Sequence, residues 1–357
     1  MKLIHCSDLH LDSKMSAHLS AEQAQNRNLE ICAAFERMIA YAKSNQVSAI
    51  LIAGDMFDER RVLRSTIDLI LNMIKQHNTL DFLYLRGNHD ALTGIPSAKL
   101  PQNLKLFSDS WTSYRCGNVV VSGVELTSEN YAQIYDDLSL NAEDINIVTL
   151  HGTLGATPMP EQVCLNKLKN KNIDYLALGH IHSYQSGAID HRGTYCYSGC
   201  LEGRGFDECG SKGFVLLDIN QYTVHATFVP FAKRKLWNIE VDISGSRSAA
   251  DILQLMQSNS LNIPTCDMVK FILCGQCSFY SSDTVSILKK MLDDRFYFVE
   301  IDDRSTVGID TIDYKRDISL KGEFTRRVLA DSSLSESDAN EILQLGLAAL
   351  CGEELKL

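Results

Sequence analysis

Short apolar runs without alternating polar positions recur through the first half of the chain. They are Leu3-Ile4 and residues 49–53, 82–85, 145–150 and 175–178. Unbroken runs of this length are typical of strands that are buried on both faces. Residues 21–43 and 65–76, which separate the first three runs, place apolar side chains at helical spacing. This alternation predicts a layered α/β fold for about the first 180 residues.

The pattern changes after Gly213. Residues 214–219 and 223–229 alternate as a hairpin, expected at a sheet edge, with Asn220-Gln221 as its turn. After Pro230, strands are predicted at 237–243, 268–274 and 296–301, and helices at 249–256 and 283–292. Two more helices are predicted at 320–329 and 338–350, the second capped by Ser335 or Ser337. We therefore divide the chain into domains 1–233, 234–318 and 319–357.

The composition is that of an ordinary globular protein, with 357 residues, 45% of them hydrophobic and 22% charged. A formal net charge of −11 argues against binding nucleic acid over the whole surface. The sequence has no apolar leader region and no run of about 18 apolar residues that would span a membrane. The 11 cysteines are scattered, and the Cys274 and Cys277 pair has no second close pair to hold zinc. We expect a reduced cytoplasmic protein without membrane contact.

Polar residues follow each of the apolar runs, in segments 7–10, 54–58, 87–90, 151–152 and 179–182. Open α/β sheets bind ligands at the carboxyl ends of their strands, so these segments are expected to converge on one rim. Carboxylates and imidazoles that converge in this way are typical metal ligands. The candidate ligands are Asp8, His10, Asp55, Asn88, His151, His180 and His182.

This number of donors predicts two divalent ions, because a single catalytic zinc needs three protein ligands. Oxygen and nitrogen donors without a thiolate suit manganese, with iron and zinc as alternatives. Asp55, on the central strand, is the expected bridge between the ions. One D-x-H or H-x-H alone is common by chance, and a lone histidine is usually structural. All the fragments in order, each after a predicted strand, favour a metal centre.

The order D-x-H, G-D, G-N-H-D, H-G, G-H-x-H resembles the calcineurin-like metallophosphoesterase superfamily over residues 1 to about 230. Within it the chain is most similar to SbcD-type, Mre-like DNA repair exonuclease subunits. The likeness rests on Ser-Asp-Leu-His-Leu-Asp at 7–12, Ala-Gly-Asp-Met-Phe-Asp at 53–58 and the small α/β domain after the core. It implies a layered α/β/β/α sandwich, a β-α-β-α-β capping domain at 234–318 and a helical tail at 319–357. The tail would dock an SbcC-type coiled-coil ATPase, and a homodimer is compatible with this arrangement.

The resemblance also implies roles for single residues. One ion would be held by Asp8, His10, Asp55 and His182, and the other by Asp55, Asn88, His151 and His180. His89 resembles the catalytic histidine of the family, and Asp90 would orient it. A purely structural role for His89 is the alternative.

These features predict a phosphodiesterase in which water, activated between two ions, attacks phosphorus in line. His89 would stabilise the developing charge or protonate the leaving oxygen. The resemblance favours a DNA repair nuclease that works with an ATPase. The main alternative is a nucleotide phosphodiesterase or phosphatase without DNA activity. The complete ligand set speaks against an inactive adaptor, and the lack of an amphipathic basic segment speaks against a lipid phosphoesterase.

Four further features have two interpretations each. Arg60 either contacts substrate phosphate or is a solvated helix charge, and Arg204 either contacts phosphate or belongs to a glycine turn. Asp58 either supports the metal ligands or stabilises its turn. The last helix carries an apolar stripe that either folds back or enters a partner's groove, and the resemblance favours the partner. The stripe consists of Ile342, Leu345, Ala349 and Leu350.

Overall fold

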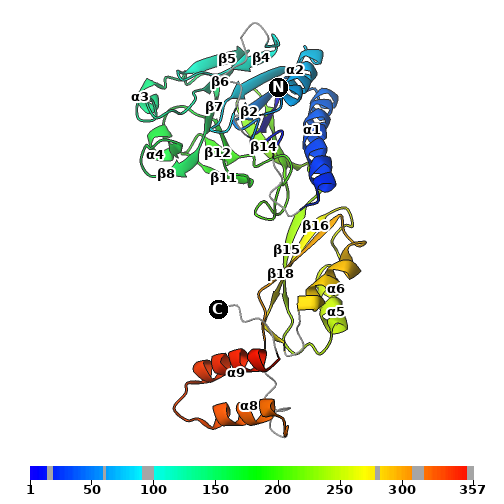
Figure 1. Cartoon of the computed structure of the whole chain (residues 1–357). Coiled ribbons are helices and arrows are strands. Elements are labelled where there is room, and N and C mark those ends of the chain that lie inside the picture. The colour runs from blue at the N-terminus through cyan, green and yellow to red at the C-terminus, as the bar shows by residue number, and fades with distance from the viewer. Residues whose placement is uncertain (14–18, 59–61, 91–99, 278–281, 308–316, 352–357) are drawn as a thin grey trace. The chain divides into compact units, whose positions relative to one another are not determined.

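The computed structural model describes residues 1–13, 19–58, 62–90, 100–277, 282–307 and 317–351 (Figure 1). Within it the chain forms two compact units, Met1–Leu236 and Trp237–Leu357. The division into three domains stays a prediction. Because Arg60 lies outside the described residues, its predicted role stays open as well.

The first unit contains two six-stranded sheets. One has the order β14-β13-β1-β2-β3-β4. Its strands are β1 (Lys2–Cys6), β2 (Ala49–Ala53), β3 (Asp81–Leu85), β4 (Leu104–Leu106), β13 (Gly213–Ile219) and β14 (Val224–Pro230). Strands β1 to β4 are parallel, whereas β13 pairs antiparallel with β1 and with β14. The predicted hairpin at the sheet edge is therefore confirmed.

The other sheet has the order β11-β12-β10-β7-β6-β5. Its strands are β5 (Thr112–Cys116), β6 (Val119–Gly123), β7 (Ile145–His151), β10 (Tyr175–Gly179), β11 (Gln185–Ala188) and β12 (Thr194–Tyr197). The strand pairs β6 with β7, β7 with β10 and β10 with β12 are parallel. A separate ribbon pairs β8 (Thr153–Gly155) with β9 (Gln162–Cys164).

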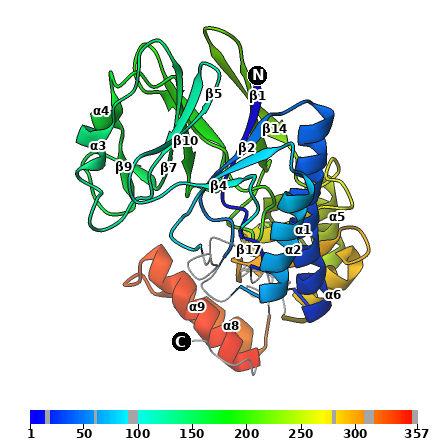
Figure 2. The same cartoon turned by 90° about the horizontal axis from the view of Figure 1, so that it is seen from above.

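Helices cover the outer faces of both sheets, as Figure 2 shows. Helices α1 (Ala21–Ser44) and α2 (Arg64–Gln76) lie outside the first sheet, and the short helices α3 (Ile134–Asp137) and α4 (Leu165–Leu168) lie outside the second. Alternate residues of each strand point to opposite faces, so Ile4 packs under the helices and Leu3 packs between the sheets. The predicted α/β/β/α layering is confirmed.

Local sequence signals explain where the main helices begin. The side chain of Ser20 accepts a hydrogen bond from the Gln23 N–H, and the Gln23 side chain accepts one from the Ser20 N–H, which forms a capping box for α1. Ser248 caps α5 (Ala249–Asn259) in the second unit through the Asp251 N–H. The predicted Ser335 cap of α9 (Glu336–Cys351) is confirmed by a 3.1 Å bond from the Asp338 N–H.

The second unit contains the predicted β-α-β-α-β pattern. Strands β15 (Leu236–Asp242), β16 (Met268–Cys274) and β18 (Phe298–Asp303) form one sheet in that order, and β17 (Gln276–Cys277) pairs with β19 (Thr306–Val307). Helix α5 and α6 (Ser282–Leu292) share a core with this sheet, in which Ile252, Phe271 and Leu288 are fully buried.

The last two helices, α8 (Leu320–Ala330) and α9, contact each other. A Cβ atom on Gly346 would lie 2.1 Å from the ring of Phe324, so the helices approach closely at this glycine. On α9, Leu343 and Leu347 are buried. The apolar stripe predicted from the sequence is not part of this buried row, since Ile342, Leu345 and Leu350 remain 38–40% exposed. This exposed stripe is named the α9 stripe below.

Candidate metal centre

The candidate ligands lie at the carboxyl ends of strands from both sheets. Asp8 and His10 follow β1, Asp55 follows β2 and Asn88 follows β3, all in the first sheet. His151 ends β7, and His180 and His182 follow β10 in the second sheet. The polar segments therefore converge as expected, but they come from the strand ends of two sheets. The strands of two packed sheets end side by side, and the ligands meet across the layer between them.

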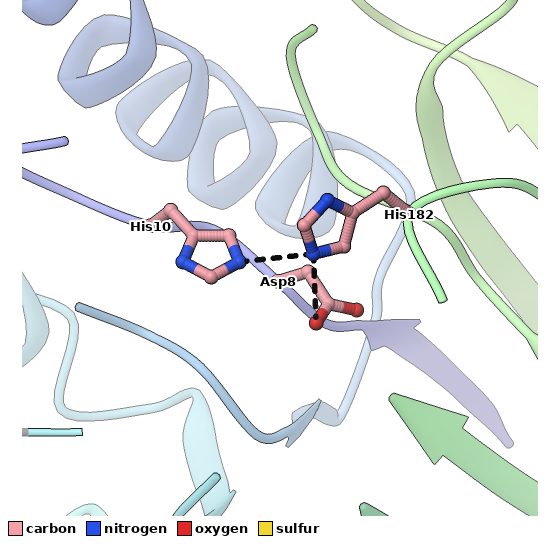
Figure 3. A group of neighbouring side chains, drawn as sticks. All are labelled: Asp8, His10 and His182. Carbon is pink, nitrogen blue, oxygen red and sulfur yellow. Dashed lines mark hydrogen bonds and ion pairs between the residues drawn. The ribbon is translucent and has the colours of Figure 1, made fainter. Parts of the chain in front are cut away.

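One group of donors consists of Asp8, His10 and His182 (Figure 3). The Nε2 atoms of the two histidines lie 3.1 Å apart, and His182 Nε2 lies 3.7 Å from Asp8 Oδ1. The Asp8 carboxylate is held by the Ser7 hydroxyl at 2.5 Å and by the backbone N–H of His180 at 3.0 Å. Asp8 and His10 are almost fully buried, so these donors are fixed before a cation binds.

A second group consists of Asp8, Asp55 and His151. His151 Nε2 lies 3.3 Å from Asp55 Oδ2 and 3.1 Å from the Asn88 side-chain oxygen. The same Asp55 Oδ2 lies 4.0 Å from His10 Nε2, while Asp55 Oδ1 accepts a hydrogen bond from the His89 N–H. One oxygen of Asp55 therefore faces both groups, which is the geometry that a bridging carboxylate needs.

The tautomers of the histidines fit a cation. His182 Nδ1 lies 2.7 Å from Glu208 Oε1, His10 Nδ1 lies 3.0 Å from Asp58 Oδ1, and His151 Nδ1 lies 2.9 Å from the Ala53 carbonyl oxygen. The Glu208 carboxylate and the Ala53 carbonyl favour a proton on Nδ1 of His182 and His151, so the Nε2 atoms of these rings face the cluster. Asp58 Oδ1 lies close to His10 Nδ1 without a hydrogen bond between them. Lone pairs and carboxylate oxygens that crowd together repel one another unless a cation lies between them. The donor set therefore fits divalent metal ions.

The backbone at the ligands is strained. Asp8, His10, Asp55 and His180 have positive φ angles between 44° and 99°. Non-glycine residues rarely adopt this left-handed region, and such strain clusters at functional sites. The adjacent Gly54 also has φ +96°, and a Cβ atom there would lie 2.0 Å from His151 Nδ1. The turn after β2 must therefore carry glycine if His151 is to reach the Ala53 carbonyl.

The electrostatics favour positive charge beside Asp55. Burial raises the pKa of Asp55, but the hydrogen bond and charge of His151 outweigh it and hold that pKa below its ordinary value. Burial lowers the pKa of His151, whereas the contact with Asp55 raises it to about 9. Burial likewise lowers the pKa of His182, and the hydrogen bond to Glu208 raises it above its ordinary value. The lowered pKa of Asp55 and the raised pKa values of His151 and His182 all reflect a site that attracts positive charge. A bound metal cation would supply that charge in place of the protons.

His89 lies at the edge of this cluster and is exposed. Its ring centre is 5.7 Å from that of His10, and its Nδ1 donates to the backbone carbonyl of Asp58 at 3.1 Å. The Asp90 carboxylate accepts hydrogen bonds from the backbone N–H groups of Phe57 and Gly87, and so it fixes the loops that carry the ligands. Its predicted role in orienting His89 stays a prediction.

Arg204 is engaged behind the ligands, and the structure does not place it as a phosphate contact. Its Nη1 donates to Asp58 Oδ1 and its Nη2 to Glu208 Oε1, both at 2.7 Å. Its side chain is only 15% exposed, because these carboxylates surround it. Asp58 supports His10, as one of its two interpretations required. Sequence reasoning missed Glu208, which lies in an irregular loop without a motif.

Beside Asn88 and His151 opens a cavity of about 220 Å³. Its lining includes Glu161 and the ion pair of Arg86 with Glu125, whose atoms lie 2.7 Å apart. The cavity adjoins the second group of donors, so it offers room for part of a substrate.

Among the described residues, no helix is long and apolar enough to cross a membrane.

Comparisons with known proteins agree with this geometry. Residues 1–184 match the family model of the calcineurin-like phosphoesterases. The uncharacterized metallophosphoesterase YhaO of Bacillus subtilis (strain 168) is 28% identical over 299 residues, which cover 77% of this chain and 72% of YhaO. The DNA double-strand break repair protein Mre11 of Methanosarcina acetivorans is 22% identical over 238 residues, which cover 62% of this chain and 37% of that protein. The chain therefore spans well under two thirds of that Mre11.

Among solved structures, TT1561 of Thermus thermophilus is 13% identical, with a TM-score of 0.41. The match covers 64% of this chain and 98% of TT1561.

Proposed function

Since this chain belongs to the calcineurin-like phosphoesterase family, whose members are phosphoester hydrolases with a dinuclear metal centre, we propose that it is a metal-dependent DNA nuclease. The observation that carries the proposal is the adjacency of the two donor groups. They share Asp8, and Asp55 Oδ2 lies 4.0 Å from His10 Nε2 and 3.3 Å from His151 Nε2. Asp8, His10, Asp55 and His182 would hold one ion, and Asp55, Asn88, His151 and His180 the other. Manganese suits this mixture of oxygen and nitrogen donors.

When bound, the two ions would activate a water molecule for attack on phosphorus and would neutralise charge on the phosphoryl oxygens. The residues of the chain then provide position and proton transfer. His89 donates its Nδ1–H to the Asp58 carbonyl, so in the imidazolium form of the ring the second proton, on Nε2, is the one that could pass to the leaving oxygen. Asp90 fixes the backbone of Gly87 and Phe57 and thereby the turns that present Asn88 and Asp55. No side chain is needed as a nucleophile.

DNA is the proposed substrate because the chain is similar to Mre11, a DNA double-strand break repair protein. The test compares release of nucleotides from linear duplex DNA with hydrolysis of bis-p-nitrophenyl phosphate, both by the manganese-loaded full chain. Nucleotide release that the Asp55→Ala variant lacks supports a nuclease. Hydrolysis of the small diester alone favours the nucleotide phosphodiesterase. Hydrolysis of neither by a protein with two bound ions contradicts a phosphodiesterase.

We also propose that the tail docks an SbcC-type ATPase. The α9 stripe supports this, because Ile342, Leu345 and Leu350 stay exposed although Leu343 and Leu347 already pack inward. An amphipathic helix with a free apolar face fits a groove on a partner. Residues 332–357 carry five acidic residues and one basic residue, Lys356, so this segment suits a protein partner better than DNA.

A further inference from the structure

One guanidinium joins the two carboxylates that support different candidate ligands. Arg204 Nη1 lies 2.7 Å from Asp58 Oδ1, and Arg204 Nη2 lies 2.7 Å from Glu208 Oε1. The backbone N–H of Arg204 also donates to Glu208 Oε2 at 2.8 Å. The same two acceptor atoms, Asp58 Oδ1 and Glu208 Oε1, lie 3.0 Å from His10 Nδ1 and 2.7 Å from His182 Nδ1. Arg204 is thus shared by both carboxylate–histidine pairs.

This arrangement determines where the Nε2 lone pairs point. A carboxylate that faces Nδ1 holds the ring in place and keeps the proton on that nitrogen. A carboxylate with no cation behind it is free to rotate toward solvent or toward another donor. The planar fork of an arginine contacts two carboxylates at once in fixed directions, which the point charge of a lysine cannot do.

Arg204 and the two carboxylates that it joins are shielded from water. Its side chain is 15% exposed, that of Asp58 17% and that of Glu208 5%, so water has little access to replace the contacts. Arg204 and Glu208 lie in the irregular loop between β12 and β13. Arg27 of α1 anchors this loop by donating to the Gly203 carbonyl oxygen at 2.8 Å. The guanidinium is therefore held in one place.

The second group of donors is supported differently. His151 Nδ1 contacts the backbone carbonyl of Ala53, which cannot rotate independently of β2. That support involves neither Arg204 nor its two carboxylates. Asp8 and Asp55 are common to the two groups, so a change at Arg204 should weaken chiefly the ion beside His10 and His182.

We infer that Arg204 is a positioning residue that sets the affinity of the ion held by Asp8, His10 and His182. The inference rests on the proposed function, since it needs a dinuclear centre. Manganese titrations of the full chain, followed by calorimetry and by the EPR signal of coupled manganese pairs, test it. Arg204→Met is expected to bind one ion as the wild type does and the other about 10- to 100-fold more weakly. The coupled-pair signal should then be lost at limiting manganese.

Arg192→Met is the matched control. Arg192 also forms a two-point ion pair in the first unit, with Asp174 at 2.9 and 3.0 Å, but Asp174 precedes β10, at the end of the sheet opposite the ligands. This variant should bind both ions as the wild type does. Lower affinity at one ion site in Arg204→Met, with both sites intact in Arg192→Met, is a pattern that a general loss of stability does not produce.

The other outcomes are equally decisive. Wild-type affinity for both ions in Arg204→Met, or equal weakening of both, overturns the inference while the proposed function stands. A wild-type chain that binds no ion pair overturns the proposed function instead. If Arg204→Met does not fold, Arg204→Lys decides, because it keeps the charge. Weaker binding of one ion by Arg204→Lys would show that the two-point contact of the guanidinium is needed. Wild-type binding of both ions by Arg204→Lys would refute that need.

Discussion

The Nε2 atoms of His10 and His182 lie 3.1 Å apart, although each ring turns its Nδ1 toward a carboxylate. Two lone pairs that face each other at this distance repel unless a proton or a cation separates them. Glu208 favours Nδ1 as the protonated position of His182, so a metal ion is the natural occupant of the space between the Nε2 atoms. Contacts made outside the metal centre therefore prepare it for a cation.

Removing a metal ligand should abolish hydrolysis without unfolding the chain. Asp55→Ala and His151→Ala each delete a donor at the strand ends and leave the three core clusters of the first unit intact. We expect activity below detection and loss of bound metal, measured by elemental analysis, with a cooperative thermal transition. Near-normal turnover with both ions bound would show that the ligand assignment is wrong.

His89→Ala should separate chemistry from metal binding. The side chain is exposed and touches the Asp58 carbonyl, while its backbone N–H holds Asp55 whichever side chain is present. We expect both ions to be retained and the rate to fall by about two to four orders of magnitude, as for loss of a general acid. Loss of metal equal to that of Asp55→Ala would make His89 a ligand.

Gly54→Ala should damage the site through a single methyl group. The added Cβ would lie 2.0 Å from His151 Nδ1, and the φ angle of +96° disfavours any side chain. We expect a loss of stability of about 1–3 kcal/mol together with weaker metal binding. Gly117→Ala is the control, because Gly117 has φ +63° but open space around its Cβ position. It should lower the melting temperature alone, and equal metal loss in both variants would contradict the steric argument.

The partly buried ion cluster around Glu30 of α1 should make stability depend on acid pH. Burial raises the pKa of Glu30, but Arg234, Lys233 and Arg27 outweigh it and lower that pKa to about 2. A depressed carboxyl pKa contributes stability above its unfolded value near 4.5, and this contribution is lost as the pH falls toward 2. Glu30→Gln should therefore melt below the wild type at pH 6, and the two should converge near pH 2.

The control for this experiment is Glu36→Gln, at an exposed position on the same helix. Its melting curve should follow that of the wild type across the pH range. A constant difference between Glu30→Gln and the wild type at every pH would mean that the carboxylate charge is not the cause.

Negative charges on the α9 stripe should prevent binding of the ATPase without changing catalysis. Ile342→Glu with Leu345→Glu alters exposed positions, whereas deletion of residues 332–357 would also remove Leu343 and Leu347, which are buried. We expect loss of co-purification with an SbcC-type ATPase and unchanged hydrolysis of bis-p-nitrophenyl phosphate. Leu261→Glu, at a leucine that is 70% exposed elsewhere in the second unit, should bind the ATPase normally. Binding by the double variant would exclude the α9 stripe as the docking surface.

Much of the fold followed from local patterns. The apolar runs located β1, β2, β3, β7 and β10, and the polar residues after them named the donors that the structure brings together. The runs contain no information about which strands share a sheet, because a strand buried on both faces reads the same in either sheet. For that reason the two facing sheets came only from the resemblance.

Contacts between distant irregular segments could not be predicted in the same way. Glu208 has no fixed spacing to His182, and Asp90 reaches Phe57 only because two loops fold against each other. On α9, the rows through Leu343 and through Ile342 are both apolar, so periodicity could not decide which row packs inward. Which contacts form, and which row of a helix packs inward, depends on the shape of the neighbouring element. A single sequence does not reveal that shape.

The position of β1 has a consequence for how the protein is made. This strand leads to Asp8 and His10, yet it lies between β2 and β13, and Met1 bonds to Ile219, 218 positions further along the chain. While the ribosome is still producing the intervening residues, one edge of β1 has no partner. Open edges invite wrong pairing, and pairings between distant residues form slowly. The strand that leads into the metal site is therefore completed only when synthesis of the first unit is nearly over.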